Sequence, residues 1–130
     1  MNAPAFRIRR RRLGPVIVLS PVGELDCHTT DLLVDRTAAA LRGSRSLVVD
    51  LSGVVFMDCH TVGVLITLCR RARERGGRLQ VAALPEHAHR LFTLLDLYEV
   101  LGGRRDVAGE CRSAVTHLVG SHRERPGTPA

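Results

Sequence analysis

The sequence predicts an α/β fold: a single domain with a mixed sheet of about five strands and about four helices. Short apolar runs alternate along the chain with segments whose apolar residues recur at helical spacing, which is typical of strands joined by right-handed helical crossovers. The 130 residues, 45% of them hydrophobic, suit one domain with a two-layer core. We expect this domain to span residues 6–119, between a flexible N-terminus at 1–5 and a disordered tail at 120–130.

The first elements are expected to be a hairpin and a helix. Residues 16–22, "VIVLSPV", are rich in β-branched side chains, and the turn pair Gly14-Pro15 separates them from residues 6–12. The following helix is expected to begin after Thr29 or Thr30, either of which is a suitable N-cap residue, and to end at Gly43.

The later elements follow the same alternation. The stretch Phe56-Met57-Asp58 is expected to be a loop that brings an acidic residue to the start of an apolar helix. In that helix, Cys69 is expected to face the core. In chain order, the expected elements are a strand at 46–51, a helix at 60–75, a strand at 78–84, a helix opened by Pro85, a short strand at 98–101 and a periodic segment carrying Cys111, Ala114, Val115 and Leu118.

The composition restricts the partners and the location. The formal net charge of +6 comes from arginine alone, and five arginines fall within residues 7–12. That run is compatible with a phosphate-binding arm or a membrane-surface patch, but a charged edge strand that resists aggregation is the favoured interpretation. Aromatic residues make up 3% of the chain and Trp is absent, so no direct nucleic-acid partner is expected. No apolar run approaches the roughly 20 residues that span a bilayer, and we expect a cytoplasmic protein.

The tetrapeptide Asp-Cys-His-Thr occurs twice, at residues 26–29 and 58–61. Each copy follows an expected strand and precedes an expected helix, so both copies are expected at the same edge of the sheet, where ligands and partners usually bind. Asp58 is suited either to cap the second helix or to contact a partner. A Cys-His pair alone lacks the oriented base, oxyanion site and pocket of an enzyme, and no phosphate-binding glycine motif is present. We therefore expect no catalytic activity and no cofactor.

Five segments of the chain occur in the order found in a known family: "VGELD" (22–26) with "HTT" behind it, "LVVDLSGVVFMD" (47–58), "VGVL" (62–65), "GGRLQVAAL" (76–84) and "LFTLLDLYEVL" (91–101). In these segments the chain resembles the STAS domain family, and within it the bacterial anti-sigma factor antagonists. The resemblance implies a protein-binding module that sequesters an anti-sigma factor and so frees a sigma factor. The implied partner is a histidine-kinase-like ATP-binding protein that is both anti-sigma factor and serine kinase.

The resemblance also shows where this chain departs from the family. The family loop usually reads Asp-Ser-Ser/Thr-Gly, and its second hydroxyl residue is phosphorylated. Here Cys59 takes the first serine position, His60 the phosphoacceptor position and Thr61 the glycine position. Histidine cannot form the stable phosphate ester of a serine, and it becomes cationic only near or below about pH 6.5. The serine switch is therefore expected to be missing, with Thr61 as the nearest alternative acceptor.

The partner-binding residues implied by this reasoning come from both loops and the start of the second helix. One alternative function is a STAS scaffold or sensory subunit without sigma control. Another is a metal- or redox-responsive regulator, in which the two Cys-His pairs converge on zinc or a helix N-terminus lowers the pKa of a thiol. The expected partner contacts are Glu24, Asp26, His28, Asp58, Cys59, His60, Thr61 and Gly63, and the residues of the metal or redox alternative are Cys27, His28, Cys59 and His60.

Overall fold

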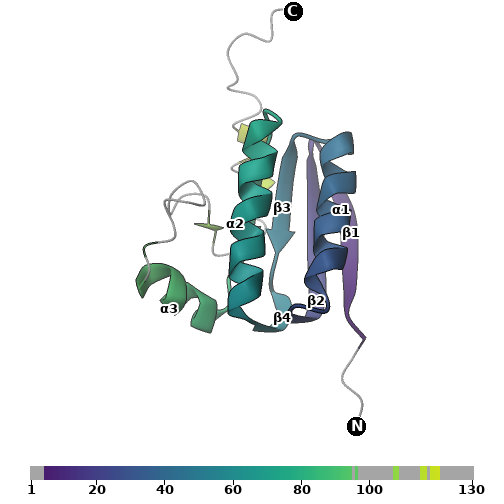
Figure 1. Cartoon of the computed structure of the whole chain (residues 1–130). Coiled ribbons are helices and arrows are strands. Elements are labelled where there is room, and N and C mark those ends of the chain that lie inside the picture. Colours follow the sequence, from purple (N-terminus) through teal and green to yellow (C-terminus); the bar gives the residue numbers. More distant parts are fainter. Residues whose placement is uncertain (1–4, 95, 97–106, 109–114, 117, 121–130) are drawn as a thin grey trace, which may run out of the picture.

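The computed structural model describes residues 5–94, 96, 107–108, 115–116 and 118–120, which form one mixed sheet flanked by helices (Figure 1). The α/β prediction is confirmed, and the sheet formed by these described residues has six strands. The strands are β1 (Arg7–Leu13), β2 (Val16–Leu25), β3 (Ser46–Asp50), β4 (Gly53–Met57), β5 (Arg78–Ala82) and β6 (Val107–Ala108), and the helices are α1 (Thr30–Gly43), α2 (Cys59–Glu74) and α3 (Glu86–Leu94).

Strand β2 organises the sheet because it pairs with three other strands. It forms the predicted antiparallel hairpin with β1, closed at Gly14, whose φ of 61° is readily adopted by glycine. Its first half pairs in parallel with β3 and its second half in parallel with β4. The sheet continues from β3 through β5 to β6, again with parallel pairing.

Strand β4 corrects the expectation that residues 56–58 form a loop. Residues 53–57 pair with the second half of β2 after a register shift between Gly23 and Glu24. Only Val54 and Met57 of β4 are buried, whereas Val55 and Phe56 are 75% and 48% exposed. The sequence did not indicate this strand because β4 is short and pairs with β2, which lies about thirty residues earlier in the chain. A local pattern of apolar residues does not record such a distant partner.

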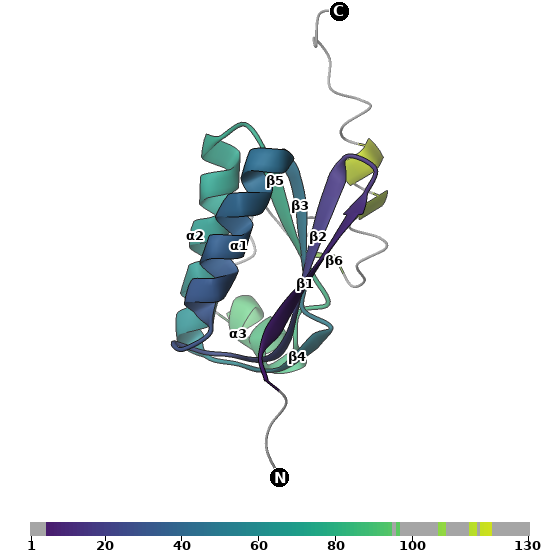
Figure 2. The same cartoon turned by 90° about the vertical axis from the view of Figure 1, so that its right-hand side faces the viewer.

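The main core lies between the sheet and helices α1 and α2, which cover the same face (Figure 2). Alternate residues of the central strands, such as Ile17 and Val49, point into this core, which also contains Cys69 as predicted. The opposite face carries a smaller cluster in which Leu118 packs against Val18 and Val48. Helical residues at 115–116 and 118–120 therefore lie on the other side of the sheet from α1 and α2.

The helix boundaries fall close to those predicted. Helix α2 begins at Cys59, one residue before the expected start, and α3 anchors its apolar face through the buried Ala88 and Phe92. The expected strand at 98–101 and most of the tail lie outside the described residues. Within the part of the chain that is described, no helix has the length and apolarity needed to cross a membrane.

Candidate functional site

The two Asp-Cys-His-Thr segments lie side by side at one end of the sheet, as predicted. Leu25 and Met57, the last residues of β2 and β4, are paired in parallel, so both chains leave the sheet at the same edge. The backbone N–H of Asp58 donates to the carbonyl of Leu25 at 3.2 Å, which ties the second loop to the end of β2.

The first loop, residues 26–29, is held by its own polar side chains. The Asp26 carboxylate accepts the backbone N–H of His28 at 2.8 Å. The Thr29 hydroxyl accepts the N–H of Asp26 at 2.9 Å and donates to the carbonyl of Glu24 at 2.8 Å. Thr29 is the residue before α1, but its side chain makes no cap hydrogen bond to the helix, so the expected capping role is not observed. The hydroxyl instead closes the turn.

Asp58 caps the second helix, as one of its two predicted roles requires. Its Oδ1 atom accepts the backbone N–H of Thr61 at 2.9 Å, which satisfies one of the unpaired donors at the start of α2. The Thr61 hydroxyl lies 2.8 Å from the same oxygen and 2.9 Å from the carbonyl of Leu25. The loop, the helix and the end of β2 therefore share one hydrogen-bond network.

The environment of Asp58 favours its ionised form. Partial burial alone would raise the pKa of this carboxyl, but the hydrogen bonds from the Thr61 N–H and hydroxyl, the nearby His60 and the backbone N–H of Cys27 together lower the pKa below its ordinary value. The carboxylate is thus a fixed negative charge at the positive end of the α2 dipole at neutral pH. The contribution of Cys27 also shows how close the two loops approach each other.

Most of the predicted contact residues lie at the surface of this edge, with one exception. Thr61 is fully buried, and its hydroxyl is engaged with Asp58 and Leu25, so its side chain is not presented to a partner. Asp26 and Asp58 are half-buried, and the exposed residues are Glu24, Cys27, His28, Cys59, His60 and Gly63.

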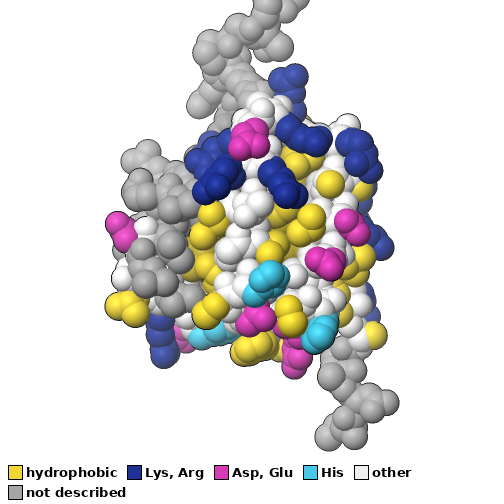
Figure 3. All heavy atoms as spheres, viewed as in Figure 1, with side chains coloured by type: hydrophobic (Ala, Val, Ile, Leu, Met, Phe, Trp, Pro, Cys, Tyr) yellow, Lys and Arg dark blue, Asp and Glu magenta, His cyan; other side chains and the backbone are white. Residues whose placement is uncertain are grey.

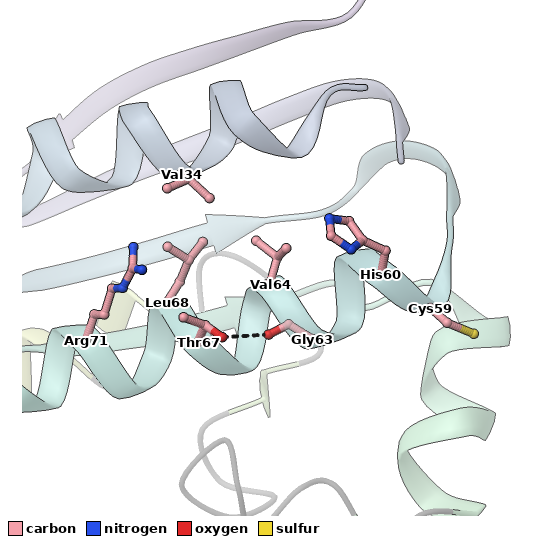
Figure 4. A pocket seen from close by; sticks show the side chains of 8 residues that line it. All are labelled: Val34, Cys59, His60, Gly63, Val64, Thr67, Leu68 and Arg71. Carbon is pink, nitrogen blue, oxygen red and sulfur yellow. Dashed lines mark hydrogen bonds between the residues drawn. The ribbon is translucent and has the colours of Figure 1, made fainter. Parts of the chain in front are cut away.

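His60 and Cys59 point in different directions, although they are neighbours (Figure 4). The His60 imidazole turns toward α1, whereas the Cys59 thiol turns away from it. His60 marks one end of a groove of about 480 Å³ between α1 and α2. The groove is lined by Val34, Cys59, His60, Gly63, Val64, Thr67, Leu68 and Arg71.

The different directions of the Cys59 and His60 side chains concern the alternative in which the two Cys-His pairs bind zinc. A tetrahedral site would need the two Cys-His pairs to aim their donor atoms at one point. Among the described residues, no group of three or more His, Cys, Asp or Glu side chains is arranged to hold a metal ion.

The face containing the groove is divided by charge along the helices (Figure 3). Apolar side chains lie in the middle, between α1 and α2, while acidic and histidine side chains gather at the end where both helices begin. Arginines gather at the opposite end. The candidate partner surface thus combines an apolar groove with an acidic and histidine-bearing rim.

A contact beside this edge was not predicted from the sequence. The Phe56 ring stacks on the His87 imidazole, with centroids 6.0 Å apart and planes 11° from parallel. The His87 Nε2 atom lies 3.0 Å from the carbonyl oxygen of Met57. Helix α3 is therefore attached to the end of β4, directly before the second loop, through a contact between residues thirty positions apart that no local pattern signals.

Comparisons with known proteins agree with this architecture. A curated relative, the anti-sigma F factor antagonist of Paenibacillus polymyxa, is 27% identical over 88 residues, which cover 66% of this chain and 75% of the relative. The crystal structure of an anti-sigma factor antagonist from Mycobacterium paratuberculosis matches with a TM-score of 0.76 at 22% identity, over 92% of this chain and 99% of the other. The phosphorylated form of the Bacillus cell fate determinant SpoIIAA matches with a TM-score of 0.65 at 17% identity, over 88% and 99% of the two chains.

The family assignment rests on a match to a family model as well as on the fold. The family model described as "Mlab, STAS domain" matches residues 8–102, which include both loops, helices α1 to α3 and the first five strands. The chain therefore belongs to the STAS domain family.

Proposed function

We propose that this STAS domain is an anti-sigma factor antagonist, a non-enzymatic module that binds an anti-sigma factor and thereby frees a sigma factor. The observation that carries the proposal is the convergence of the two loops at one edge of the sheet, beside the apolar groove between α1 and α2. The curated relative from Paenibacillus polymyxa, named as an anti-sigma F factor antagonist, supports the same role.

The proposed partner is a histidine-kinase-like ATP-binding protein that acts as anti-sigma factor and serine kinase. It would contact the exposed rim residues Glu24, His28 and His60 and extend over the groove. Gly63 is exposed within that groove, and a Cβ atom added to it would meet no atom within 4 Å. The absence of a side chain there lets a partner approach the helix backbone closely.

Binding is proposed to be constitutive rather than switched by phosphorylation. His60 occupies the phosphoacceptor position and offers no hydroxyl. The only hydroxyl in residues 58–61 belongs to Thr61, which is fully buried and lies within hydrogen-bond distance of two acceptors. A kinase could reach this hydroxyl only after the start of α2 had opened, which would break the Asp58 cap.

The partner is identified by affinity purification from the native cell extract followed by mass spectrometry. We expect recovery of an ATP-binding anti-sigma factor, and we expect the purified chain to restore transcription that this factor inhibits. Gly63→Trp should abolish both effects because it fills the groove without disturbing the fold. Glu74→Trp is the matched control, since Glu74 is exposed at the opposite end of α2. Recovery of a larger sensory assembly without an anti-sigma factor would favour the scaffold alternative.

The absence of a switch is tested by intact-mass analysis after incubation with the partner and ATP. We expect no stable phosphate on the wild-type chain, whereas a phosphate that disappears in Thr61→Ala would show that the switch had moved to Thr61. His60→Ser is the converse variant. A phosphorylated His60→Ser chain that loses partner binding would show that the loop keeps the geometry of a switch and lacks only the acceptor.

A further inference from the structure

Five arginines gather where α1 and α2 end, opposite the proposed partner-binding edge; we call this group the arginine pole. Figure 3 shows the concentration of arginine side chains at that end of the molecule. Three members line a shallow hollow of about 550 Å³, together with Leu41, Gly43 and Ser44. The arginine pole consists of Arg10, Arg12, Arg42, Arg45 and Arg75, all of them exposed.

Strand β1 contributes to the pole because its side chains alternate between the two faces of the sheet. Arg10 and Arg12 pair with Leu19 and Ile17, which point toward α1. A Cβ atom added to Gly43 would lie 3.5 Å from a terminal nitrogen of Arg10 and 3.6 Å from one of Arg12. Two guanidinium groups thus converge on the last residue of α1.

The other arginines of the N-terminal run lie on the opposite face. Arg9 pairs with Ser20 and Arg11 with Val18, and the Val18 side chain belongs to the small cluster on the face away from α1 and α2. Arg7 lies two residues before Arg9 in the strand and therefore shares its face. The run at residues 7–12 is therefore divided between two surfaces.

Few of these positive charges are needed to stabilise the C-terminal ends of α1 and α2. The carbonyls of Ala40 and Ala72, near the ends of α1 and α2, accept the N–H groups of Ser44 and Gly77 at 3.0 and 2.8 Å. The Arg12 side chain donates to the Gly43 carbonyl at the end of α1, at 2.9 Å, and the backbone N–H of Arg75 donates to the Ala72 carbonyl at the end of α2, at 3.2 Å. The two helix ends together correspond to about one negative elementary charge, whereas the pole carries five positive charges.

The positive charge of the pole is also not neutralised by neighbouring carboxylates. Within the described part of the chain, no Asp or Glu oxygen forms an ion pair with any pole arginine. The backbone of Arg45 is held next to β5, because its carbonyl accepts the N–H of Arg78 at 2.7 Å. The fold thus gathers these charges without pairing them with a carboxylate of the described residues.

We propose that the arginine pole is a binding site for an anion that carries several phosphate charges. Guanidinium groups donate in a planar fork that matches pairs of phosphate oxygens, and several of them around one hollow favour a polyphosphate over a single phosphate. The residues that line the hollow include no aromatic side chain, so the site offers no stacking surface for a nucleic-acid base. The phosphate groups belong either to a free small molecule or to a lipid headgroup.

The test is isothermal titration of the full chain with sodium tripolyphosphate at constant ionic strength. The pole variant replaces three hollow-lining arginines by glutamine, and the control variant removes the same charge from the opposite face of β1. Circular dichroism confirms that both variants are folded. The pole variant is Arg42→Gln/Arg45→Gln/Arg75→Gln, and the control is Arg7→Gln/Arg9→Gln/Arg11→Gln.

We expect saturable binding that weakens at least about tenfold in the pole variant and less than about twofold in the control, because charge-assisted hydrogen bonds are lost only in the former. Equal weakening in both variants would overturn the proposal, since net charge alone would then explain the binding. Duplex DNA that binds where tripolyphosphate does not would also overturn it.

Vesicle sedimentation identifies the source of the phosphate. Pole-dependent binding to vesicles that contain phosphatidylinositol bisphosphate, with none to phosphatidylcholine vesicles, would assign a lipid headgroup. Tripolyphosphate binding without vesicle binding would assign a free small molecule. The pole variant should retain anti-sigma factor binding at the opposite edge, so failure of this inference is distinguishable from failure of the proposed function.

Discussion

The Asp58 cap joins the fold to the proposed function, and its replacement has an effect that can be worked out from the structure. Asp58→Ala removes the acceptor of the Thr61 N–H at 2.9 Å, and loss of an N-cap side chain costs about 0.5–2 kcal/mol. The Thr61 hydroxyl keeps the Leu25 carbonyl at 2.9 Å, so no buried hydroxyl is left without a partner. We therefore expect the free energy of unfolding to fall by about 1–2 kcal/mol.

Asp58→Asn separates the hydrogen bond from the charge. Asparagine caps a helix about as well as aspartate, so only the attraction between the carboxylate and the helix dipole is lost, about 0.3–1 kcal/mol. The order of stability at neutral pH should be wild type, then Asp58→Asn, then Asp58→Ala.

The pH dependence of this difference follows from the lowered pKa of Asp58. Because folding lowers the pKa of Asp58 below its ordinary value, the folded chain binds a proton less readily than the unfolded chain does. The stabilisation is complete above the unfolded-state pKa and is lost as the pH falls through the folded-state pKa. The advantage of the wild type over Asp58→Asn should accordingly be constant above about pH 5 and shrink as the pH falls from there through the lowered folded-state pKa.

The assay is urea unfolding followed by far-ultraviolet circular dichroism, since the chain contains no Trp to serve as a fluorescent probe. An Asp58→Ala variant as stable as the wild type would refute the capping argument. A wild-type advantage over Asp58→Asn that stays constant with pH would refute the electrostatic part.

Three further predictions concern other parts of the fold. Gly63→Ala should raise the free energy of unfolding by about 0.5–1 kcal/mol in the same assay, because alanine favours the helix and its Cβ meets no atom within 4 Å; a loss of stability would contradict this. Phe92→Ala should lower it by about 3–5 kcal/mol, because the ring is fully buried; a change below about 1 kcal/mol would show that α3 packs differently. Cys69 should resist iodoacetamide at pH 8 in peptide mapping while the exposed Cys27 and Cys59 react, because burial raises the pKa of Cys69 to about 12; equal labelling would contradict the burial.

The sequence by itself determined the parts of the fold that depend on near neighbours. The apolar run at 16–22 and the helical spacing at 60–75 are set by local sterics and by which face must be buried, so β2 and α2 were predicted closely. The placement of both Asp-Cys-His-Thr loops at one edge followed from the geometry of parallel strands.

Only the tertiary structure decided features that depend on residues far apart in the chain. Strand β4 exists because the second half of β2 offers it a pairing edge. Thr61 is buried because the Leu25 carbonyl, thirty-six positions away, accepts its hydroxyl. The arginine run at 7–12 is divided because β1 alternates between a face shared with α1 and one that is not. Each of these three features depends on a residue that lies far away in the sequence and is brought close by packing. The local periodicity of the sequence does not indicate which residue that is.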